Sequence, residues 1–147
     1  MTGWRIGYLG APVDIVEAIS RLQDHSTSNP CSISQKAAVA ALGMSDEFVK
    51  KMTFEFRQRR DYLASRIKNI KKMGYLLPSG AFYMFCDISP TKMDSLVLAN
   101  RLLDEAMVAV IPGDGFGRQD YIRLSFATSM QQIEKGMNRI EEWFTKI

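Results

Sequence analysis

Residues 46–147 alternate between two spacings of apolar side chains, and this alternation limits the folds open to the chain. Apolar residues recur at intervals typical of amphipathic helices over 46–72, 96–107 and 129–147. Between these segments, 81–88 and 121–127 have the composition or the period of two that predicts strands, and 108–111 is a brief strand pattern closed by Pro112. The pattern therefore predicts three helices and three short strands in this part of the chain.

The first 45 residues carry weaker signals. Alternation of large and small or charged residues over 3–9 predicts a short strand, and Pro12 begins a helical pattern that reaches about Asp24. The polar run 26–30 has loop chemistry and is the best candidate for a boundary. Farther on, Gly74 is placed to end the helix over 46–72 in a left-handed cap.

Composition excludes several classes of protein. A length of 147 residues corresponds to about one domain, and 46% hydrophobic with 24% charged residues is typical of a globular chain rather than a disordered one. The longest uncharged apolar stretch, 37–44, is far shorter than a membrane span needs. Met1 leads into no secretory signal, so we expect a cytoplasmic protein.

The net charge of +3 is concentrated on the helix predicted over 46–72. Clustered Lys and Arg can bind nucleic acid, so a non-enzymatic module that grips nucleic acid or an acidic partner is one function to consider. The basic residues are spread around the helix and interleaved with acids, however, which favours a solvated face.

The sequence gives little support for a metal site, a disulfide, a hydrolytic triad or a dinucleotide-binding loop. Cys31 and Cys86 are far apart in the sequence, and His25 is the only histidine, so we expect no metal site, no disulfide and no hydrolytic triad. The glycine-rich string 113–117 has the wrong spacing for a dinucleotide fingerprint and is interpreted as a mobile turn between two strands.

Two arginines are more informative. Arg5 and Arg123 lie within predicted strands, beside apolar residues that face a core. Each must find an anion or point to water, and its planar fork suits a phosphate or carboxylate. From the residues alone, binding of two anionic ligand groups and structural ion pairs remain equally good explanations.

Four strings in order resemble a known family, the fold-type I, class I aminotransferases that use pyridoxal phosphate, and its prokaryotic aspartate branch most closely. The strings are Met1-Thr2-Gly3-Trp4-Arg5-Ile6-Gly7-Tyr8, Ser26-Thr27-Ser28-Asn29-Pro30 with Ser32-Ile33-Ser34-Gln35, Pro78-Ser79-Gly80-Ala81-Phe82-Tyr83, and Ile111-Pro112-Gly113 through Phe116-Gly117 to Ile122-Arg123-Leu124-Ser125-Phe126-Ala127. The first and last are the most specific.

The resemblance implies that Arg5 binds the cofactor phosphate and that Arg123 binds the α-carboxylate of the substrate. It implies an α/β fold, with an α+β small domain whose three- to four-stranded, largely antiparallel sheet is covered by helices. Residues 1–33 are then a remnant of the large cofactor-binding domain, and 34–147 are the small C-terminal domain. The loop 26–30 implies a homodimer, because in such enzymes it approaches the neighbouring subunit's site.

The same resemblance places the lysine that forms a Schiff base with the cofactor upstream of Met1, so no catalytic residue is expected in this chain. We therefore expect the C-terminal part of an enzyme that transfers an amino group from aspartate or a related amino acid to a 2-oxo acid, inactive as a separate piece. A redox or lyase relative on the same cofactor frame is a weaker alternative, since one fold hosts several reactions.

Overall fold

The computed structural model describes all 147 residues and divides into two compact units, Met1–Glu47 and Phe48–Ile147. The first unit contains a 3-10 helix η1 (Thr2–Trp4) and two α-helices, α1 (Val13–Ser26) and α2 (Ser32–Leu42). The division predicted after residue 33 concerns the domains of a longer enzyme and stays a prediction. The helix predicted from Pro12 is confirmed, with α1 beginning one residue later.

The strand predicted over residues 3–9 is wrong. Thr2–Trp4 forms a 3-10 turn, and no strand pairs with the residues that follow it. The alternating pattern lacks a neighbouring strand to take its backbone hydrogen bonds, and a lone strand has no other source of stability. Instead, the buried hydroxyl of Ser34 in α2 donates a hydrogen bond of 2.9 Å to the carbonyl of Trp4.

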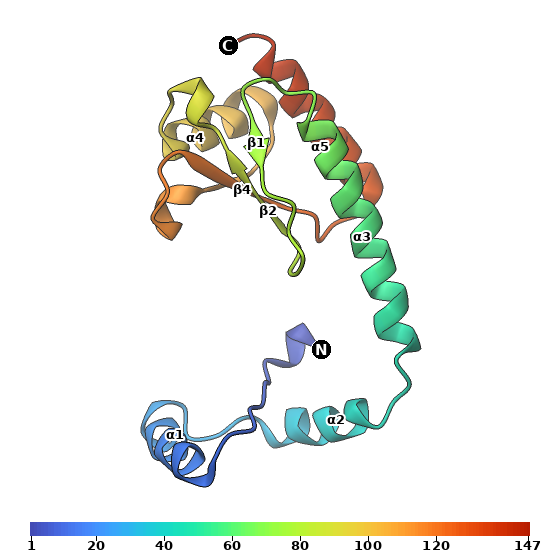
Figure 1. The fold of residues 1–147 in the computed structure, drawn as a ribbon, viewed down its shortest axis with the longest axis vertical. Coiled ribbons are helices and arrows are strands. Elements are labelled where there is room, and N and C mark those ends of the chain that lie inside the picture. The colour runs from blue at the N-terminus through green and yellow to red at the C-terminus, as the bar shows by residue number, and fades with distance from the viewer. The chain divides into compact units, whose positions relative to one another are not determined.

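The second unit is a four-stranded sheet with three long helices (Figure 1). Its strands have the order β1-β2-β4-β3, and each neighbouring pair is antiparallel, which confirms the predicted fold class. The elements are α3 (Glu47–Ile67), β1 (Gly74–Tyr75), β2 (Tyr83–Asp87), η2 (Ser89–Thr91), α4 (Ser95–Ala106), β3 (Ile111–Pro112), η3 (Gly113–Phe116), β4 (Tyr121–Ser125) and α5 (Met130–Phe144).

The two faces of this sheet differ in character. Met84 and Cys86 of β2 and Ile122 and Leu124 of β4 are buried in the core, which the three helices complete. Because side chains alternate along a strand, the residues between them lie on the opposite face, where they are only half-buried. The helices therefore cover one face, and the other face is available for a site.

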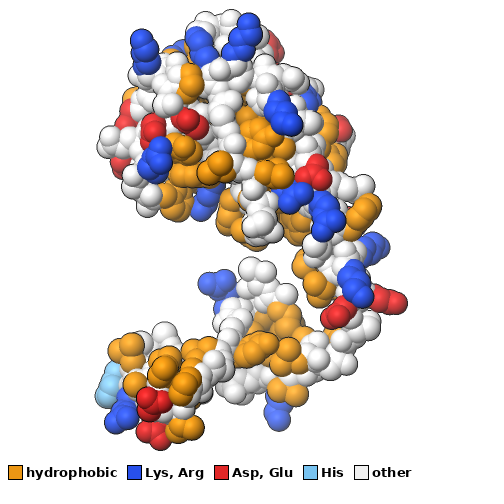
Figure 2. Space-filling view, in the orientation of Figure 1, with side chains coloured by type: hydrophobic (Ala, Val, Ile, Leu, Met, Phe, Trp, Pro, Cys, Tyr) orange, Lys and Arg blue, Asp and Glu red, His pale blue; other side chains and the backbone are white.

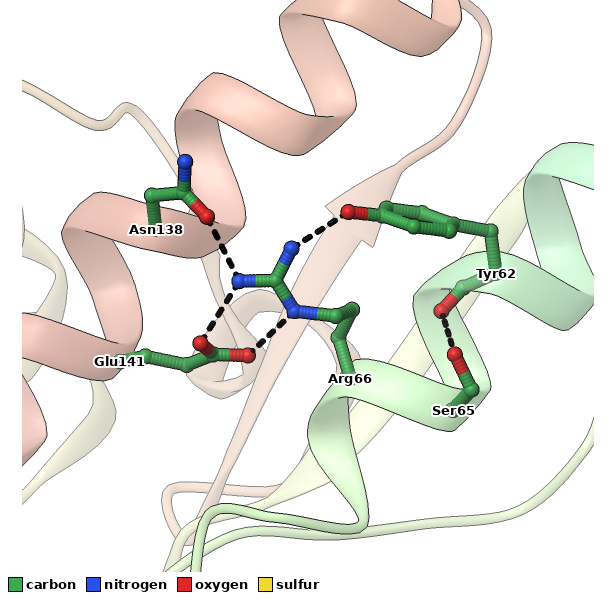
Figure 3. Close-up of polar contacts among 5 residues, drawn as sticks. All are labelled: Tyr62, Ser65, Arg66, Asn138 and Glu141. Carbon is green, nitrogen blue, oxygen red and sulfur yellow. Dashed lines mark hydrogen bonds and ion pairs between the residues drawn. The ribbon is translucent and has the colours of Figure 1, made fainter.

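A polar clasp joins α3 to α5 on the helical side (Figure 3). The guanidinium of Arg66 donates from Nε and Nη2 to the two carboxylate oxygens of Glu141, each at 2.6 Å. Nη2 also donates to Asn138 at 2.7 Å, and Nη1 donates to the hydroxyl of Tyr62. These hydrogen bonds raise the pKa of Arg66 and fix how the two helices lie together.

Three sequence expectations need correction. The helix predicted over 46–72 ends at Ile67, because tight turns follow that bury Ile70 and Met73 in the core. Gly74 is not a helix cap but the first residue of β1, opposite Asp87. The strand predicted over 108–111 begins only at Ile111, since the N–H of Val108 bonds back to Leu102 at the end of α4. No helix of the structure is both long and apolar enough to cross a membrane.

Candidate functional site

Arg123 projects from the open face of the sheet. It lies in β4, where its Cα pairs with that of Phe85 in β2 and that of Ile111 in β3. Its guanidinium carbon lies over two aromatic rings, 4.2 Å from the ring centroid of Tyr83 and 4.7 Å from that of Phe116. A planar cation over an aromatic face is an attractive arrangement.

The guanidinium of Arg123 makes no hydrogen bond and no ion pair. Most arginines of the chain donate to a carboxylate or a carbonyl. The other two without such a partner, Arg5 and Arg57, are exposed, whereas Arg123 is half-buried. A half-buried guanidinium whose N–H donors are all free is suited to bind an anionic ligand. Two of its parallel N–H groups match the two oxygens of a carboxylate in spacing.

Phe116 reaches this site from η3, the string that was predicted to be a mobile turn. The turn between two strands is confirmed: residues 113–116 form a 3-10 helix between β3 and β4, which ends at Gly117 in the left-handed conformation, with φ of 76°. The mobility of this turn stays a prediction. Gly113 at its start is buried, and a Cβ there would lie 2.3 Å from the carbonyl oxygen of Arg118. The N–H of Asp114 donates to the hydroxyl of Ser95 at 3.3 Å, which ties the turn to α4.

Further aromatic side chains surround the stacked arginine. The rings of Phe85 and Tyr121 stack at 4.8 Å, and Phe85 also meets Phe116 edge to face at 6.1 Å. Beside them Arg118 lies over Tyr121 at 4.1 Å and pairs with Asp120, an interaction that lowers the pKa of that carboxyl. The charge of Arg118 is thus matched within the protein, whereas that of Arg123 is not.

Sequence reasoning identified Arg123 but missed Tyr83 and Phe116 as its neighbours. For Tyr83 a signal was present, because alternation along β2 opposite Met84 puts it on the same face as Arg123. For Phe116 no signal of this kind exists, since its position depends on how η3 folds back.

Arg5 lies in the first compact unit and is described there by itself. It caps η1 in the left-handed conformation, with φ of 50°, and its side chain is exposed. Its guanidinium has no partner, so its donors are free to bind a phosphate. Its assignment to a cofactor phosphate, like that of Arg123 to a carboxylate, stays a prediction.

Other candidate sites are less well formed. No group of three or more His, Cys, Asp or Glu residues is placed to hold a metal ion. On the basic helix α3, Arg59 pairs with Glu55 at 3.5 Å and Arg60 with Asp61 at 2.7 Å, in addition to the clasp of Arg66. Part of the charge that suggested nucleic acid is therefore matched by acids of the protein itself.

Comparisons with known proteins identify the family of this chain. The family model for aminotransferase class I and II matches residues 1–140. A probable aspartate/prephenate aminotransferase of Rickettsia conorii and an aspartate aminotransferase of Geobacillus stearothermophilus are each 42% identical to the chain, over 97% of its length.

Solved structures give the same result. The aromatic aminotransferase from Pyrococcus horikoshii superposes with a TM-score of 0.90 at 34% identity, covering 99% of this chain and 40% of that one. The aspartate aminotransferase from Thermus thermophilus with maleate has a TM-score of 0.88 at 39% identity, covering 97% and 37%. The chain spans about 38% of the length of the curated relatives it matches. On the family match, the sequence identity and the fold together, this chain belongs to the class I and II aminotransferases.

Proposed function

We propose that the chain is the C-terminal part of a pyridoxal-phosphate-dependent aminotransferase, in which Arg123 binds the α-carboxylate of an amino acid and of a 2-oxo acid. The observation that carries this proposal is the half-buried guanidinium of Arg123, which lies over two rings and has no hydrogen-bond or ion-pair partner within these 147 residues. Membership of the family makes an amino-group transfer the reaction to expect.

The arrangement suits a reaction with two alternating substrates. An amino acid and a 2-oxo acid differ at the carbon that reacts, but both carry a carboxylate next to it. One arginine fork can therefore orient either substrate, and aromatic neighbours exclude water around the ion pair. Aspartate or a related acidic amino acid is the proposed donor, in line with the relatives named aspartate aminotransferases.

The cofactor supplies the electron sink for this chemistry when it is bound. On this chain, Arg5 is the group that fits its phosphate, because the side chain is exposed and its donors are unpartnered. We place the lysine that shuttles the proton outside the 147 residues, and so we expect this chain alone to be inactive. The intact enzyme is proposed to be a cytoplasmic homodimer of amino-acid metabolism.

The proposal is tested in the intact enzyme that contains this chain. Arg123→Ala is expected to raise the KM for aspartate and to lower kcat/KM about 30- to 900-fold. This factor corresponds to the roughly 2 to 4 kcal/mol that a bidentate ion pair between arginine and a carboxylate contributes when water is excluded from it. Arg57→Ala is the matched control, since Arg57 also lacks a partner but is exposed on α3. Equal kinetics for the two variants would contradict the assignment of Arg123.

The role of Arg5 has a separate readout. Arg5→Ala is expected to weaken retention of the cofactor, measured by absorbance of the bound cofactor after dialysis, without a comparable change in carboxylate affinity of the loaded enzyme. Full occupancy of the variant at low cofactor concentration argues against a phosphate contact.

Absence of nucleic-acid binding is also part of the proposal. A salt titration with duplex DNA decides it, because binding by a basic surface weakens steeply with salt. No measurable binding near physiological salt is expected, and tight binding there would favour the basic-helix alternative.

A further inference from the structure

The guanidinium of Arg123 is held only by aromatic rings, and this restricts how it can meet a ligand. We propose that Tyr83 and Phe116 are positioning residues, which fix the plane of that guanidinium so that its N–H fork is preorganised for a flat carboxylate. This inference rests on the proposed function, in which Arg123 binds the substrate.

The first step of the argument concerns mobility. An arginine side chain has many rotamers, and fixing it in one geometry costs conformational entropy. No hydrogen bond or ion pair fixes Arg123, so its contacts at 4.2 Å with the ring of Tyr83 and at 4.7 Å with the ring of Phe116 are what restrict it. These contacts bring the guanidinium carbon over the rings and use none of its N–H groups as hydrogen-bond donors, so all the donors stay available to a ligand.

The second step concerns the rings themselves, which are carried by ordered backbone. Tyr83 begins β2 and pairs there with Ser125 of β4. Phe116 ends η3, a turn fixed by the close approach of Gly113 to the backbone of Arg118 and Tyr121. Both rings therefore lie at defined places relative to β4.

The third step concerns what Phe116 does for the fold. Its side chain is 51% exposed and lies outside the buried core. Its aromatic contacts are Arg123 and the ring of Phe85. A large apolar side chain that buries so little adds little to stability, and its contact with the cation is the more specific of its interactions.

A positioning role makes a distinctive kinetic prediction. Removing one ring leaves the charge of Arg123 in place but frees its plane, so carboxylate affinity falls about three- to tenfold rather than vanishing. Both substrates present the same carboxylate, so the KM values for aspartate and for 2-oxoglutarate should rise by the same factor. A loss of general structure would instead lower kcat and the melting temperature.

The test compares Phe116→Leu, Phe116→Tyr and the control Phe48→Leu in the intact enzyme. Phe48 is an exposed phenylalanine of α3, 67% accessible. We expect a three- to tenfold rise in both KM values for Phe116→Leu, wild-type values for Phe116→Tyr because the ring is kept, and no change for Phe48→Leu. Tyr83→Leu should behave as Phe116→Leu does, and Tyr83→Phe as the wild type.

A second measurement does not depend on turnover. In the 147-residue chain, the Nε–H proton of Arg123 should show an upfield ring-current shift by NMR, which diminishes in Phe116→Leu. Unchanged KM values in Phe116→Leu, together with a large loss in Arg123→Ala, would overturn this inference and leave the proposed function standing. Unchanged kinetics in both variants would overturn the proposed function, and this inference with it.

Discussion

The two cysteines show how position alone changes the chemistry of one kind of side chain. Cys86 faces the core from β2 and is fully buried, and the loss of hydration for its thiolate raises its pKa to about 12. Cys31 is exposed before the first turn of α2, where backbone N–H groups of Ser34 and Ile33 lower its pKa. The sequence predicts two reduced thiols, but their opposite shifts depend on the fold.

Burial of Cys86 makes stability depend on alkaline pH. In the unfolded chain this thiol loses its proton near its ordinary pKa of 9.0, whereas in the folded chain it keeps the proton up to about 12. The folded state therefore binds more protons between these values. The free energy of unfolding should fall as pH rises through this window, by up to about 1.4 kcal/mol per pH unit, and the contribution is complete below pH 9.

Urea unfolding from pH 8 to 10.5 measures this slope, with Cys86→Ala as the control. The informative quantity is the difference in slope between the two proteins, because every other titrating group contributes equally to both. If the stability of the wild-type chain and that of Cys86→Ala depended on pH in the same way, Cys86 would ionise as readily in the folded chain as in the unfolded one.

At the scale of elements, local signals predicted helices and strands better than they predicted turns. Ser129 followed by Gln132 three residues later is a sequence pattern that predicts the start of a helix, and the N–H of Gln132 donates to the hydroxyl of Ser129 at 3.3 Å at the start of α5. The reciprocal bond from the side chain of Gln132 is not formed, so only the N-cap half of the motif is present. Alternation in β4 is confirmed by the burial of Ile122 and Leu124. The strand over 3–9 failed because pairing needs a partner that a local pattern does not reveal.

In the candidate site, too, some residues could be predicted from the sequence and others could not. Arg123 could be predicted because a charge within an alternating strand is visible in the sequence. Phe116 could not, because the conformation of η3 depends on how Gly113 fits against the backbone of residues 118 and 121. Contacts of this kind join parts of the chain that no periodicity relates.

Gly113 should therefore tolerate no side chain. A Cβ would lie 2.3 Å and 2.5 Å from two backbone oxygens, which cannot move as a flexible side chain can. We expect Gly113→Ala to lower the free energy of unfolding by about 2 to 3 kcal/mol, the upper range for overpacking, and to displace Phe116. Gly115→Ala is the control, because no atom lies within 4 Å of its Cβ. Equal stabilities of the two variants, measured in urea, would show that η3 adapts.

The clasp between α3 and α5 makes an energetic prediction of its own. The side chains of Arg66 and Glu141 are 20% and 30% exposed, so solvent screens their attraction in part. We expect Arg66→Ala to cost about 2 kcal/mol, with a coupling energy to Glu141→Gln of about 1 kcal/mol in a double-mutant cycle. Lys146→Ala is a suitable control, since its pair with Glu142 is mostly exposed. Simple additivity of the two clasp mutations would mean that the ion pair adds nothing.

At the scale of the whole molecule, the two compact units differ in how much they bury. In residues 1–47 only Ser34 is buried, and large apolar side chains such as Tyr8, Val13 and Leu22 are exposed. The second unit contains the whole buried apolar core. Figure 2 shows hydrophobic side chains on the visible surface of each unit. A helix that buries no apolar stripe has little beyond its propensity to stabilise it.

The rate of backbone amide exchange should therefore differ between residues 1–47 and residues 48–147. In hydrogen–deuterium exchange of the 147-residue chain, amides of α1 and α2 are expected to exchange within seconds, since helices of 14 and 11 residues without buried apolar contacts open locally. Amides of β2, β4 and α5 should be protected up to global unfolding, because their side chains form the core. Mass spectrometry of peptides from one sample compares both units under identical conditions. Protection of α1 equal to that of α5 would require a source of stability for residues 1–47 other than their own packing, and would overturn the view that only residues 48–147 fold cooperatively.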